Sequence, residues 1–465
     1  MVAKQAHVFV LDDCVIGPDG EVIVEKSPQT VTDVVKLTQW LTKRGAHAPV
    51  FWLLGAELAQ RYGWLDNPED VKATAEAVHD SVLDAYKVLD SNAIVEKRAY
   101  RFRVCRSWAR RDEVIAEVIA ARLGMITDGN RGVIDNLVTD DPVREIIHRV
   151  RWINDHLGIE AAGPAAQLGA RIAEQTWNPL PPEGQWPLTE AQLTPTRLEP
   201  VTNWAAEKPV RGGKLVVTDQ RRAVLAAMGT TPLGVGAPEH FPNAEDIDWA
   251  EKNPPVAVAL VTFPALSYLN LPESFKVHPA QRVDEPVTDW ACTRTIKQML
   301  EPTADGGHGM DSSDLEIGEA YVWPQTSVKL GAWAKKIRDA IAEADGDPSL
   351  DRLFKEIYAR YYSHVSSQYS AKTVHSQLVW SGCIRADVRA RGLRYQAKIQ
   401  RDYNGLLPVA GVADAWIYRL PARADSSFLT DPSTANGKYR VKEELPHTVE
   451  TWRKLTRTTR TGQPK

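Results

Sequence analysis

The chain has 465 residues, a formal net charge of −4, an apolar fraction of 43 % and a charged fraction of 25 %. This length is enough for two or more domains, and both fractions are ordinary for a soluble globular protein. The net charge excludes a polycation, so any nucleic-acid surface must be a local basic patch.

Cysteine usage and hydropathy narrow the class of protein further. The four cysteines lie too far apart in the sequence to form a zinc or redox motif, so we expect a reduced, cytoplasmic protein. No stretch approaches the ~18 apolar residues of a membrane helix. The N-terminal sequence "MVAKQAHVFVLDD" also lacks the apolar core and cleavage site of a signal peptide. We therefore expect no membrane partner.

The N-terminal section predicts a small α/β unit. Residues 7–27 are typical of two strands joined by a Gly-Pro-Asp-Gly turn. Residues 30–45 have helical spacing with a glycine stop, and residues 48–55 form a short apolar run suited to a buried strand. Periodicity further predicts helices at residues 68–90 and 112–123.

Arginines and aromatic residues interleave in the stretch "EKRAYRFRVCRSWARRDE", residues 96–113. Alternation within it predicts that Arg101, Arg103 and Arg106 lie near one rim of a strand. One interpretation is a DNA contact, in which these arginines bind phosphates and a base stacks on Tyr100 or Trp108. The alternative is a solvated edge strand whose arginine stems cover apolar surface.

A proline-rich stretch at residues 176–200 is the best candidate for a linker, because proline disfavours both long helices and central strands. We therefore predict an N-terminal domain over residues 1–175 and a second domain over residues 201–450. Residues 451–465 carry several basic side chains and read as a C-terminal tail. Such a tail is either a basic arm that contacts a nucleic-acid backbone or an ordinary chain end.

Two aspartates in the second domain suggest a metal site. Asp219 ends the apolar run Leu215-Val216-Val217 just before a helical stretch, and Asp414 interrupts the apolar segment 405–418 at a predicted hairpin tip. Taken singly, they read as a helix N-cap and a turn residue. Taken together, two carboxylates on neighbouring strands can hold two Mg²⁺ ions ~4 Å apart for phosphoryl transfer.

A helix predicted over residues 350–367 lies between these aspartates in the sequence. Lys355, Tyr358 and Tyr362 fall at spacings of three and four residues, outside the apolar stripe of the helix. A lysine followed by two tyrosines can hold a triphosphate and stack under a base. The alternative is an ordinary amphipathic helix with a surface lysine and half-buried tyrosines.

The order of these motifs resembles the polymerase half of family-B DNA polymerases. "VVTDQRRAVLAAM" resembles the first palm motif, with Asp219 at the metal-binding position, and "KEIYARYYS" resembles the finger-helix motif, with Lys355 and Tyr362 in place. "VAD" resembles the catalytic hairpin: Asp414 stands at its metal-binding position and Val412 replaces its first aspartate. "GKYRVKEE" resembles the strand beyond that hairpin, with Lys438 and Lys442 as candidate phosphate or primer contacts.

The chain is more closely similar to telomere-associated proteins of linear actinobacterial plasmids and chromosomes. This resemblance covers most of the chain and is most specific over residues 381–418, which read as a long basic helix followed by the hairpin. The basic face includes Arg385, Arg389 and Arg394 as DNA-binding candidates. In the first domain we find no Asp-x-Glu exonuclease motif, so we expect no proofreading activity.

The resemblance implies an α/β (α+β) fold, with a ribonuclease H-like N-terminal domain followed by a polymerase palm with helical fingers. It implies a nucleoid-associated DNA-directed DNA polymerase that uses Mg²⁺ or Mn²⁺, acts on single-stranded or primer-template ends and takes deoxynucleoside triphosphates. Lys336 and Arg338 are further candidates for the triphosphate, with a solvated helix face as the alternative reading. The alternative function is a catalytically silent DNA-end scaffold that recruits a terminal protein. A nuclease is a weaker reading, because further acidic ligands are not evident.

Overall fold

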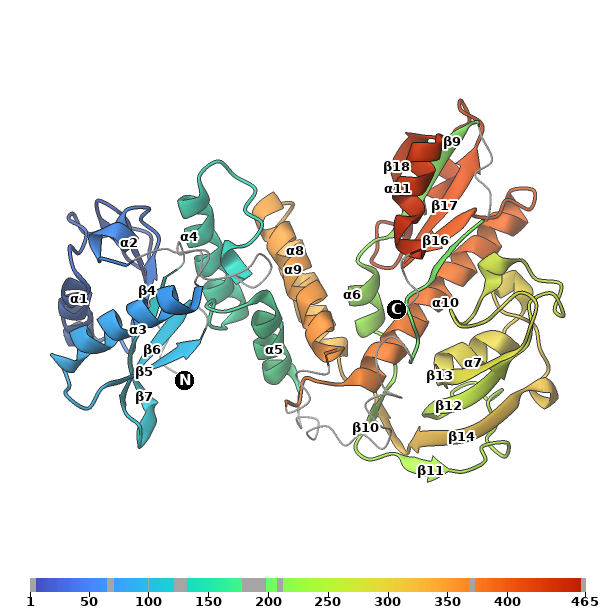
Figure 1. The fold of residues 1–465 in the computed structure, drawn as a ribbon, viewed down its shortest axis with the longest axis horizontal. Helices are drawn as coiled ribbons and strands as arrows, with labels where there is room; N and C mark the ends of the chain where they lie inside the picture. Colours follow the sequence, from blue (N-terminus) through green and yellow to red (C-terminus); the bar gives the residue numbers. More distant parts are fainter. Residues whose placement is uncertain are drawn as a thin grey trace. The chain divides into compact units, whose positions relative to one another are not determined.

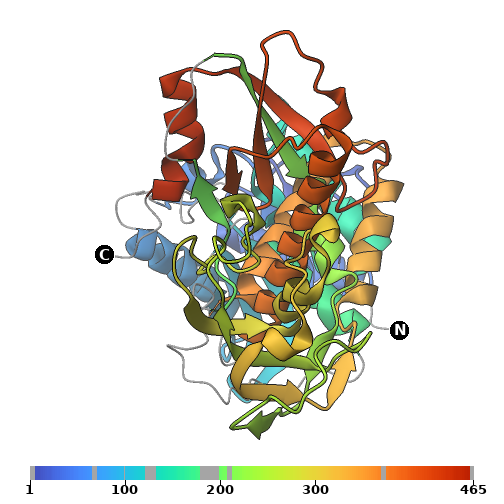
Figure 2. The same ribbon diagram turned by 90° about the vertical axis from the view of Figure 1, so that its right-hand side faces the viewer.

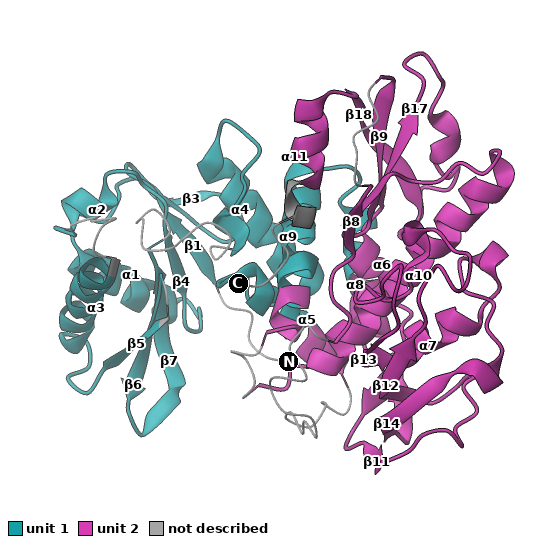
Figure 3. Cartoon of the chain, turned by 45° about the vertical axis from the view of Figure 1, so that its right-hand side comes forward, with its two compact units in different colours: residues 1–172, 337–361 teal, residues 173–336, 362–465 magenta. Residues whose placement is uncertain are grey.

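The computed structural model describes residues 6–64, 71–98, 100–120, 132–177, 198–206, 212–367 and 373–460. Most of the proline-rich stretch predicted as a linker lies outside these residues. The chain divides into two compact units (Figure 3). The first contains residues 1–172 and 337–361, and the second contains residues 173–336 and 362–465. Residues 337–361, which the sequence analysis placed in the second domain, thus group with the first unit.

The first unit is built on a seven-stranded sheet (Figure 1). Its strands, in spatial order, are β3 (Val22–Val24), β2 (Val15–Ile16), β1 (His7–Val10), β4 (Val50–Leu53), β7 (Arg110–Ile119), β6 (Arg101–Ser107) and β5 (Ile94–Arg98). The central strands β1, β4 and β7 run parallel, and the outer pairs are antiparallel. Every residue of β1 and β4 is buried, as the apolar runs predict for the centre of a covered sheet.

The helices of the first unit come from two separate stretches of the chain, residues 1–172 and 337–361. They are α1 (Val31–Lys43), α2 (Leu58–Arg61), α3 (Val71–Lys87), α4 (Pro142–Trp152), a π-helical turn at Ile153–Leu157, and most of α5 (Ala165–Thr176), α8 (Gly331–Glu343) and α9 (Pro348–Val365). Helix α1 begins at a capping box, in which Thr30 accepts from the Asp33 amide and the Asp33 side chain accepts in return. The helix predicted at residues 30–45 is therefore confirmed.

The helix predicted at residues 112–123 is wrong over its described part. Residues 110–119 form the strand β7, which pairs in parallel with β4 and antiparallel with β6. Its second half, Ala116–Ile119, is buried. The β-branched residues Val114, Ile115, Val118 and Ile119 favour a strand, and pairing on both sides overrides the apparent helical spacing.

The second unit contains a five-stranded antiparallel sheet that carries both predicted metal-binding aspartates. Its spatial order is β18 (Tyr439–Pro446), β9 (Lys214–Gln220), β17 (Ala415–Leu420), β16 (Ala410–Val412) and β8 (Asn203–Ala205). Helix α11 (Val449–Arg460) packs on it through Trp452, which is 2 % exposed and contacts a cluster with Leu215, Val217 and Ile417. Most of the predicted C-terminal tail is therefore a docked helix, and residues 461–465 lie outside the described part.

The long helix α10 (Leu378–Asp402) runs beside this sheet in both orientations shown (Figures 1 and 2). Leu393 and Ile399 of α10 share a buried apolar cluster with Trp416 and Tyr418 of β17. The same cluster extends into a four-stranded sheet in the order β11 (Glu239–Phe241), β14 (Glu316–Trp323), β12 (Val256–Phe263) and β13 (Val287–Cys292). Helix α10 is therefore a shared support for the two sheets.

The remaining elements of the second unit are short. They are α6 (Ala223–Met228), α7 (Thr293–Leu300), the paired strands β10 (Leu233–Val235) and β15 (Gln325–Ser327), and 3₁₀ turns at Glu273–Phe275, Thr303–Asp305, Ser312–Asp314 and Ser427–Leu429. A further 3₁₀ turn, Gly132–Ile134, belongs to the first unit. Within the described ranges, no helix combines the length and apolar character needed to cross a membrane.

Candidate active site

Asp219 and Asp414 are carried by neighbouring strands of the five-stranded sheet. Asp219 is the penultimate residue of β9, and Asp414 lies at the tip of the β16–β17 hairpin. Trp416 pairs with Thr218 in the β9–β17 ladder, so the hairpin tip falls beside the end of β9 that bears Asp219. Ala413, the other tip residue, has φ +54° and donates its amide to the Thr202 carbonyl at 2.8 Å. That bond ties the strained tip to the segment preceding β8.

The two carboxylates are close enough to influence each other's ionisation. Burial and the nearby Asp219 charge, with a hydrogen bond between the two side chains, raise the pKa of Asp414 from 3.8 to about 6. Lys442 acts in the opposite direction, and its Nζ lies 3.6 Å from Oδ2 of Asp219. The positive charge of Lys442 thus offsets only part of the repulsion between the Asp219 and Asp414 carboxylates. A divalent cation bound by both would offset the rest.

The donor set fits a hard divalent cation. Carboxylate oxygens are the ligands that Mg²⁺ and Mn²⁺ prefer, and one or two protein carboxylates commonly suffice where substrate phosphates and waters complete the shell. Among the residues that the structure describes, no group of three His, Cys, Asp or Glu side chains could hold a metal ion. The pair therefore fits a site completed by a phosphate-bearing substrate better than a self-contained metal centre.

Tyr362 and Arg385, predicted separately for nucleotide and DNA, lie together in the second unit. Arg385 Nε donates to Tyr362 Oη at 3.0 Å, and Tyr362 Oη donates to the Ser381 carbonyl at 3.1 Å. Burial raises the pKa of Tyr362, so its hydroxyl stays protonated at neutral pH. Arg385 also donates to the Glu199 carbonyl at 3.1 Å, which links Tyr362 to the interior of the unit.

The predicted basic face of α10 is only partly exposed. Arg389 is 7 % exposed, and its guanidinium bonds to the fully buried Glu199 and to Thr295. These bonds make Arg389 a structural ion-pair residue of the interior. Arg394 lies on the surface with its side chain 48 % exposed, and its Nε lies 3.8 Å from a Glu301 carboxylate oxygen.

The other predicted basic residues of the second unit lie at its surface. The Lys438 side chain is 49 % exposed, and its Nζ lies 3.7 Å from an Asp431 carboxylate oxygen. Lys336 Nζ donates to Gln175 Oε1 at 2.5 Å, and burial lowers the pKa of this lysine. Neither contact involves the two site carboxylates.

Lys355 and Arg338 belong to the first unit. Lys355 is exposed on α9, and Arg338 is half-buried on α8. Tyr358, expected on the same face as Lys355, is 8 % exposed and belongs to the core of the unit. The four residues predicted to bind a nucleotide are therefore divided between the two units, with Lys336 and Tyr362 in the second.

The arginines of β6 form ion pairs along the sheet. Arg101 is 9 % exposed and donates from Nε to Glu117 at 2.8 Å, which makes it an interior ion-pair residue. Arg103 lies 3.6 Å from Glu96 and 3.8 Å from Glu117, and Arg106 lies 3.1 Å from Glu113. These pairs favour the structural reading of the strand for Arg101 and Arg103.

An aromatic–arginine pair marks the tip of the β6–β7 hairpin. Trp108 is 67 % exposed, and the Arg111 guanidinium lies 5.4 Å from its ring centroid. Arg106 stays near this tip with its side chain 52 % exposed. Tyr100, the other predicted stacking residue, is 1 % exposed and packs in the core. Trp108 is therefore the aromatic side chain of this strand pair that a base can reach.

Asp12, an acidic residue at the end of the first strand, has a structural role. Its carboxylate accepts from the backbone amides of Ala56 at 2.8 Å and Glu57 at 2.9 Å. These bonds hold the loop between β4 and α2 against the end of β1. The carboxylate thus serves the fold of the N-terminal unit.

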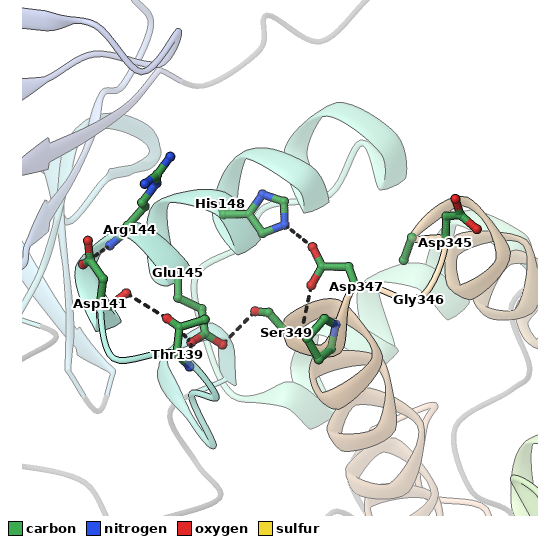
Figure 4. Close-up of a pocket in the computed structure, with 11 residues that line it drawn as sticks. Thr139, Asp141, Arg144, Glu145, His148, Asp345, Gly346, Asp347 and Ser349 are labelled. Atoms are coloured by element: carbon green, nitrogen blue, oxygen red, sulfur yellow. Dashed lines mark hydrogen bonds and ion pairs between the residues drawn. The ribbon is translucent and has the colours of Figure 1, made fainter.

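A pocket of about 690 Å³ in the first unit lies at the start of α9 (Figure 4). His148 Nε2 lies 2.7 Å from Asp347 Oδ2, and Ser349 Oγ donates to the buried Glu145 at 2.7 Å. Arg149 donates in turn to Ser349 Oγ at 2.8 Å. These contacts secure the first turn of α9 to α4, and the pocket contains none of the predicted site residues.

Tyr439 and Gln220 are residues of the site that the sequence analysis missed. Tyr439 Oη donates to the Asp414 carbonyl at 3.1 Å and accepts from Gln220 Nε2 at 2.9 Å. Gln220 could have been suspected only because it follows Asp219. The contact between Tyr439 and the hairpin depends on the pairing of β18 with β9, which the local sequence does not specify.

Comparison with known proteins gives structural matches alone. No protein-family model matches the sequence, and no curated protein matches it. The structure of Phi29 DNA polymerase complexed with primer-template DNA and incoming nucleotide substrates aligns with a TM-score of 0.53 and 11 % identity, covering 96 % of this chain and 85 % of that chain. The orthorhombic crystal form of Phi29 DNA polymerase aligns at 0.49 with 10 % identity, covering 95 % and 85 %.

The complex of Phi29 DNA polymerase with single-stranded DNA aligns at 0.48, with 10 % identity and the same coverages of 95 % and 85 %. The ternary-complex alignment extends over nearly the whole of this chain, and at its low identity it concerns the fold alone. It confirms the fold class predicted from the sequence. This mixed α/β chain has the fold of a DNA polymerase.

Proposed function

We propose that this chain binds DNA ends and carries out metal-dependent nucleotidyl transfer with Asp219 and Asp414. The observation that carries the proposal is the placement of Asp219 at the end of β9 beside the hairpin tip that bears Asp414, with Lys442 Nζ 3.6 Å from Asp219. Two neighbouring carboxylates are costly for folding unless a cation compensates their charge, and the pKa of Asp414 is accordingly raised to about 6. Their place within a polymerase fold supports nucleotidyl transfer as the chemistry.

Each residue near the carboxylate pair is assigned a role that fits its side-chain chemistry. Asp219 and Asp414 would hold Mg²⁺ or Mn²⁺, and the metal would supply charge stabilisation to the phosphoryl group and to the attacking and leaving oxygens. Asp414 would have to be ionised to hold the metal, because a carboxylate binds a hard cation in its deprotonated form. Lys442, beside Asp219, neutralises charge at the primer or the phosphates.

The incoming nucleotide is assigned to the remaining candidates. Tyr362, held by Arg385, supplies the stacking face for the base or sugar. In the second unit, the cationic side chain of Lys336 is proposed to contact the triphosphate, while Lys355 and Arg338 of the first unit remain candidate phosphate contacts.

DNA contacts are assigned to the exposed basic residues. Arg394 and Lys438 in the second unit are proposed to bind phosphates, and Arg106 to act with Trp108 as a stacking platform for a single strand. Arg101, Arg103, Arg385 and Arg389 support these elements through their observed bonds.

The alternative function is a DNA-end scaffold of linear replicons that recruits a terminal protein without extending a primer. One observation favours it: Val412 stands where the catalytic hairpin of family-B polymerases has its first aspartate. Under this alternative the polymerase shape serves to hold the DNA end.

Primer extension separates these functions. A labelled primer-template is incubated with deoxynucleoside triphosphates and Mg²⁺ or Mn²⁺, using wild-type protein, the Asp219→Asn and Asp414→Asn variants, and Asp284→Asn as an exposed-carboxylate control. The proposal predicts extension by wild type and control, and loss by at least about 100-fold in each site variant. Tight binding of the same DNA by all four proteins without extension would establish the scaffold instead.

A further inference from the structure

A single tyrosine hydroxyl connects the surroundings of the two site carboxylates. Tyr439 begins β18 and pairs directly with Gln220 of β9, the residue that follows Asp219. Its Oη donates to the backbone carbonyl of Asp414 at 3.1 Å and accepts from Gln220 Nε2 at 2.9 Å. The hairpin tip with one carboxylate is thereby bonded to the strand that carries the other.

The same network is attached to α10. Gln220 Nε2 also donates to the Val388 carbonyl at 2.9 Å, and Trp416 Nε1 donates to the Gly392 carbonyl at 3.1 Å. A Cβ at position 392 would lie 2.9 Å from Tyr439 Oη and 3.0 Å from Trp416 Nε1. Glycine at this position therefore allows both polar groups to approach the helix closely.

The hydrogen-bond network is buried. Tyr439, Gln220 and Trp416 are each at most 4 % exposed. The Tyr439 ring stacks on Tyr395 with centroids 3.8 Å apart and planes 9° apart. Burial raises the pKa of Tyr439, so its hydroxyl keeps the proton that it donates to the Asp414 carbonyl.

We propose that Tyr439 and Gln220 are positioning residues, which set the separation of the Asp219 and Asp414 carboxylates for metal binding. This inference rests on the proposed function. The carboxylates repel each other, and the hairpin tip that bears Asp414 is a two-residue turn with a strained Ala413. The Tyr439 hydroxyl holds the backbone of that tip in place, so a metal ion meets a preformed pair instead of having to assemble it.

The chain offers a matched control for testing this role. Tyr439→Phe removes the hydroxyl and keeps the stacked ring. Tyr395→Phe removes the other hydroxyl of the same stack, which donates to the Leu429 carbonyl at 2.7 Å. Each variant loses one hydroxyl bonded to a backbone carbonyl, and the Tyr439 variant alone loses the bond to Asp414.

The readouts are Mn²⁺ affinity, measured by electron paramagnetic resonance, and kcat and KM for single-nucleotide incorporation. Tyr439→Phe should lower Mn²⁺ affinity and kcat by about 10- to 100-fold, the usual effect of removing a group that orients a metal-binding residue. KM for DNA should stay within about 3-fold, because uniform binding is untouched. Tyr395→Phe should stay within about 3-fold of wild type in every readout.

A second variant examines the other half of the network. Gln220→Met keeps the length of the side chain and removes the donor to Tyr439. Because the two residues act in series, Gln220→Met combined with Tyr439→Phe should cost little more than the larger single effect.

The positioning role would be overturned if Tyr439→Phe and Tyr395→Phe lost Mn²⁺ affinity and kcat equally, or if Tyr439→Phe kept the Mn²⁺ affinity of wild type. In either case, primer extension by wild-type protein would still support the proposed function. Mn²⁺ affinity that falls in Tyr439→Phe alone would support the positioning role even if wild-type protein failed to extend a primer. Absence of Mn²⁺ binding in wild type would overturn both.

Discussion

At the scale of single residues, ionisation of Asp414, the carboxylate proposed to bind a metal, weakens the fold. Its pKa in the folded protein is raised to about 6 from an ordinary value of 3.8, by burial and by the charge of Asp219. The folded state therefore binds a proton more tightly than the unfolded chain between these values. The stabilising contribution of this group is complete below its ordinary pKa and is lost as the pH rises through about 6.

Asp414→Asn should accordingly stabilise the metal-free protein at pH 7.5, because the amide cannot ionise. The expected gain is about 1–3 kcal/mol at pH 7.5, and it should disappear near pH 4, where the wild-type carboxyl is protonated too. Urea unfolding in the presence of EDTA at the two pH values measures the difference. An offset that is the same at both values would show that the ionisation of Asp414 is not its cause.

Glu199 combines a strained backbone conformation with a buried charge. It has φ +63°, is fully buried, and accepts from the Cys292 amide at 2.8 Å and Thr295 Oγ1 at 2.6 Å while pairing with Arg389. A non-glycine residue in this backbone conformation needs surrounding bonds that enforce it. Glu199 thus joins the end of the proline-rich stretch to α7 and α10.

Glu199→Ala should lower the free energy of unfolding by about 3–5 kcal/mol, because the Arg389 guanidinium would remain buried and unpaired. Chemical denaturation measures this loss. Glu199→Ala combined with Arg389→Met should recover part of it, since the unpaired charge is gone. Breaking the exposed Arg394–Glu301 pair with Arg394→Met should cost at most about 1 kcal/mol. A loss in Glu199→Ala no larger than in this control would contradict the structural role given to the buried pair.

At the scale of elements, α11 shows where the sequence was misread. Several basic residues in its last turns suggested a tail, yet Trp452 and Thr456 are 2 % and 1 % exposed. The helix uses one narrow apolar side to cover β9 and β17, which leaves its other side free for charged residues.

Trp452→Ala should therefore destabilise the second unit by about 3–5 kcal/mol, the usual cost of removing a large buried aromatic side chain. Deletion of residues 461–465 serves as the control and should change stability by less than about 0.5 kcal/mol. Thermal or chemical unfolding provides the comparison. If both changes left the transition unmoved, the packing of α11 on the sheet would be refuted.

The elements of the candidate site could be predicted from the sequence where a short stretch of residues specifies them. A strand ending in Asp219 and a hairpin bearing Asp414 can be recognised from short stretches of sequence. The register that sets Tyr439 against Gln220 is a contact between distant segments and has no local signal. The burial of Arg389 was equally hidden, because α10 carries arginines toward both the interior and the surface.

At the scale of the whole molecule, the proposed DNA binding by a chain of net charge −4 requires local basic patches. Arg394 and Lys438 are about half exposed and lie on the second unit, which also carries the carboxylate pair. Each residue that neutralises one phosphate contributes about −0.9 to the slope of log K against log salt for duplex DNA.

The Arg394→Ala/Lys438→Ala double variant should therefore weaken binding to different duplex sequences to a similar extent. The slope of log K against log salt should become less steep by the amount expected for about two lost phosphate contacts. Fluorescence anisotropy over a series of salt concentrations gives both quantities. Lys36→Ala, an exposed lysine on α1, should leave the slope unchanged. A slope unaltered in the double variant would remove these residues from the DNA surface.

The residues predicted to bind a nucleotide are divided between the two units. Lys355 and Tyr362 lie on one continuous helix in the sequence, but the boundary between the units falls after Tyr361 within α9. The first turn of that helix is bonded to α4 through Ser349, Glu145 and Arg149. Periodicity predicts a helix from its own residues and carries no information about which unit its ends join.

The most direct test of the central claim is Mn²⁺ binding by the wild-type chain and by the Asp219→Asn and Asp414→Asn variants, followed by electron paramagnetic resonance at pH 7.5. The carboxylate pair predicts saturable binding by wild type and at least about tenfold weaker binding in each variant. Equal Mn²⁺ affinity in wild type and in the Asp219→Asn/Asp414→Asn double variant would show that the two carboxylates do not form a metal site.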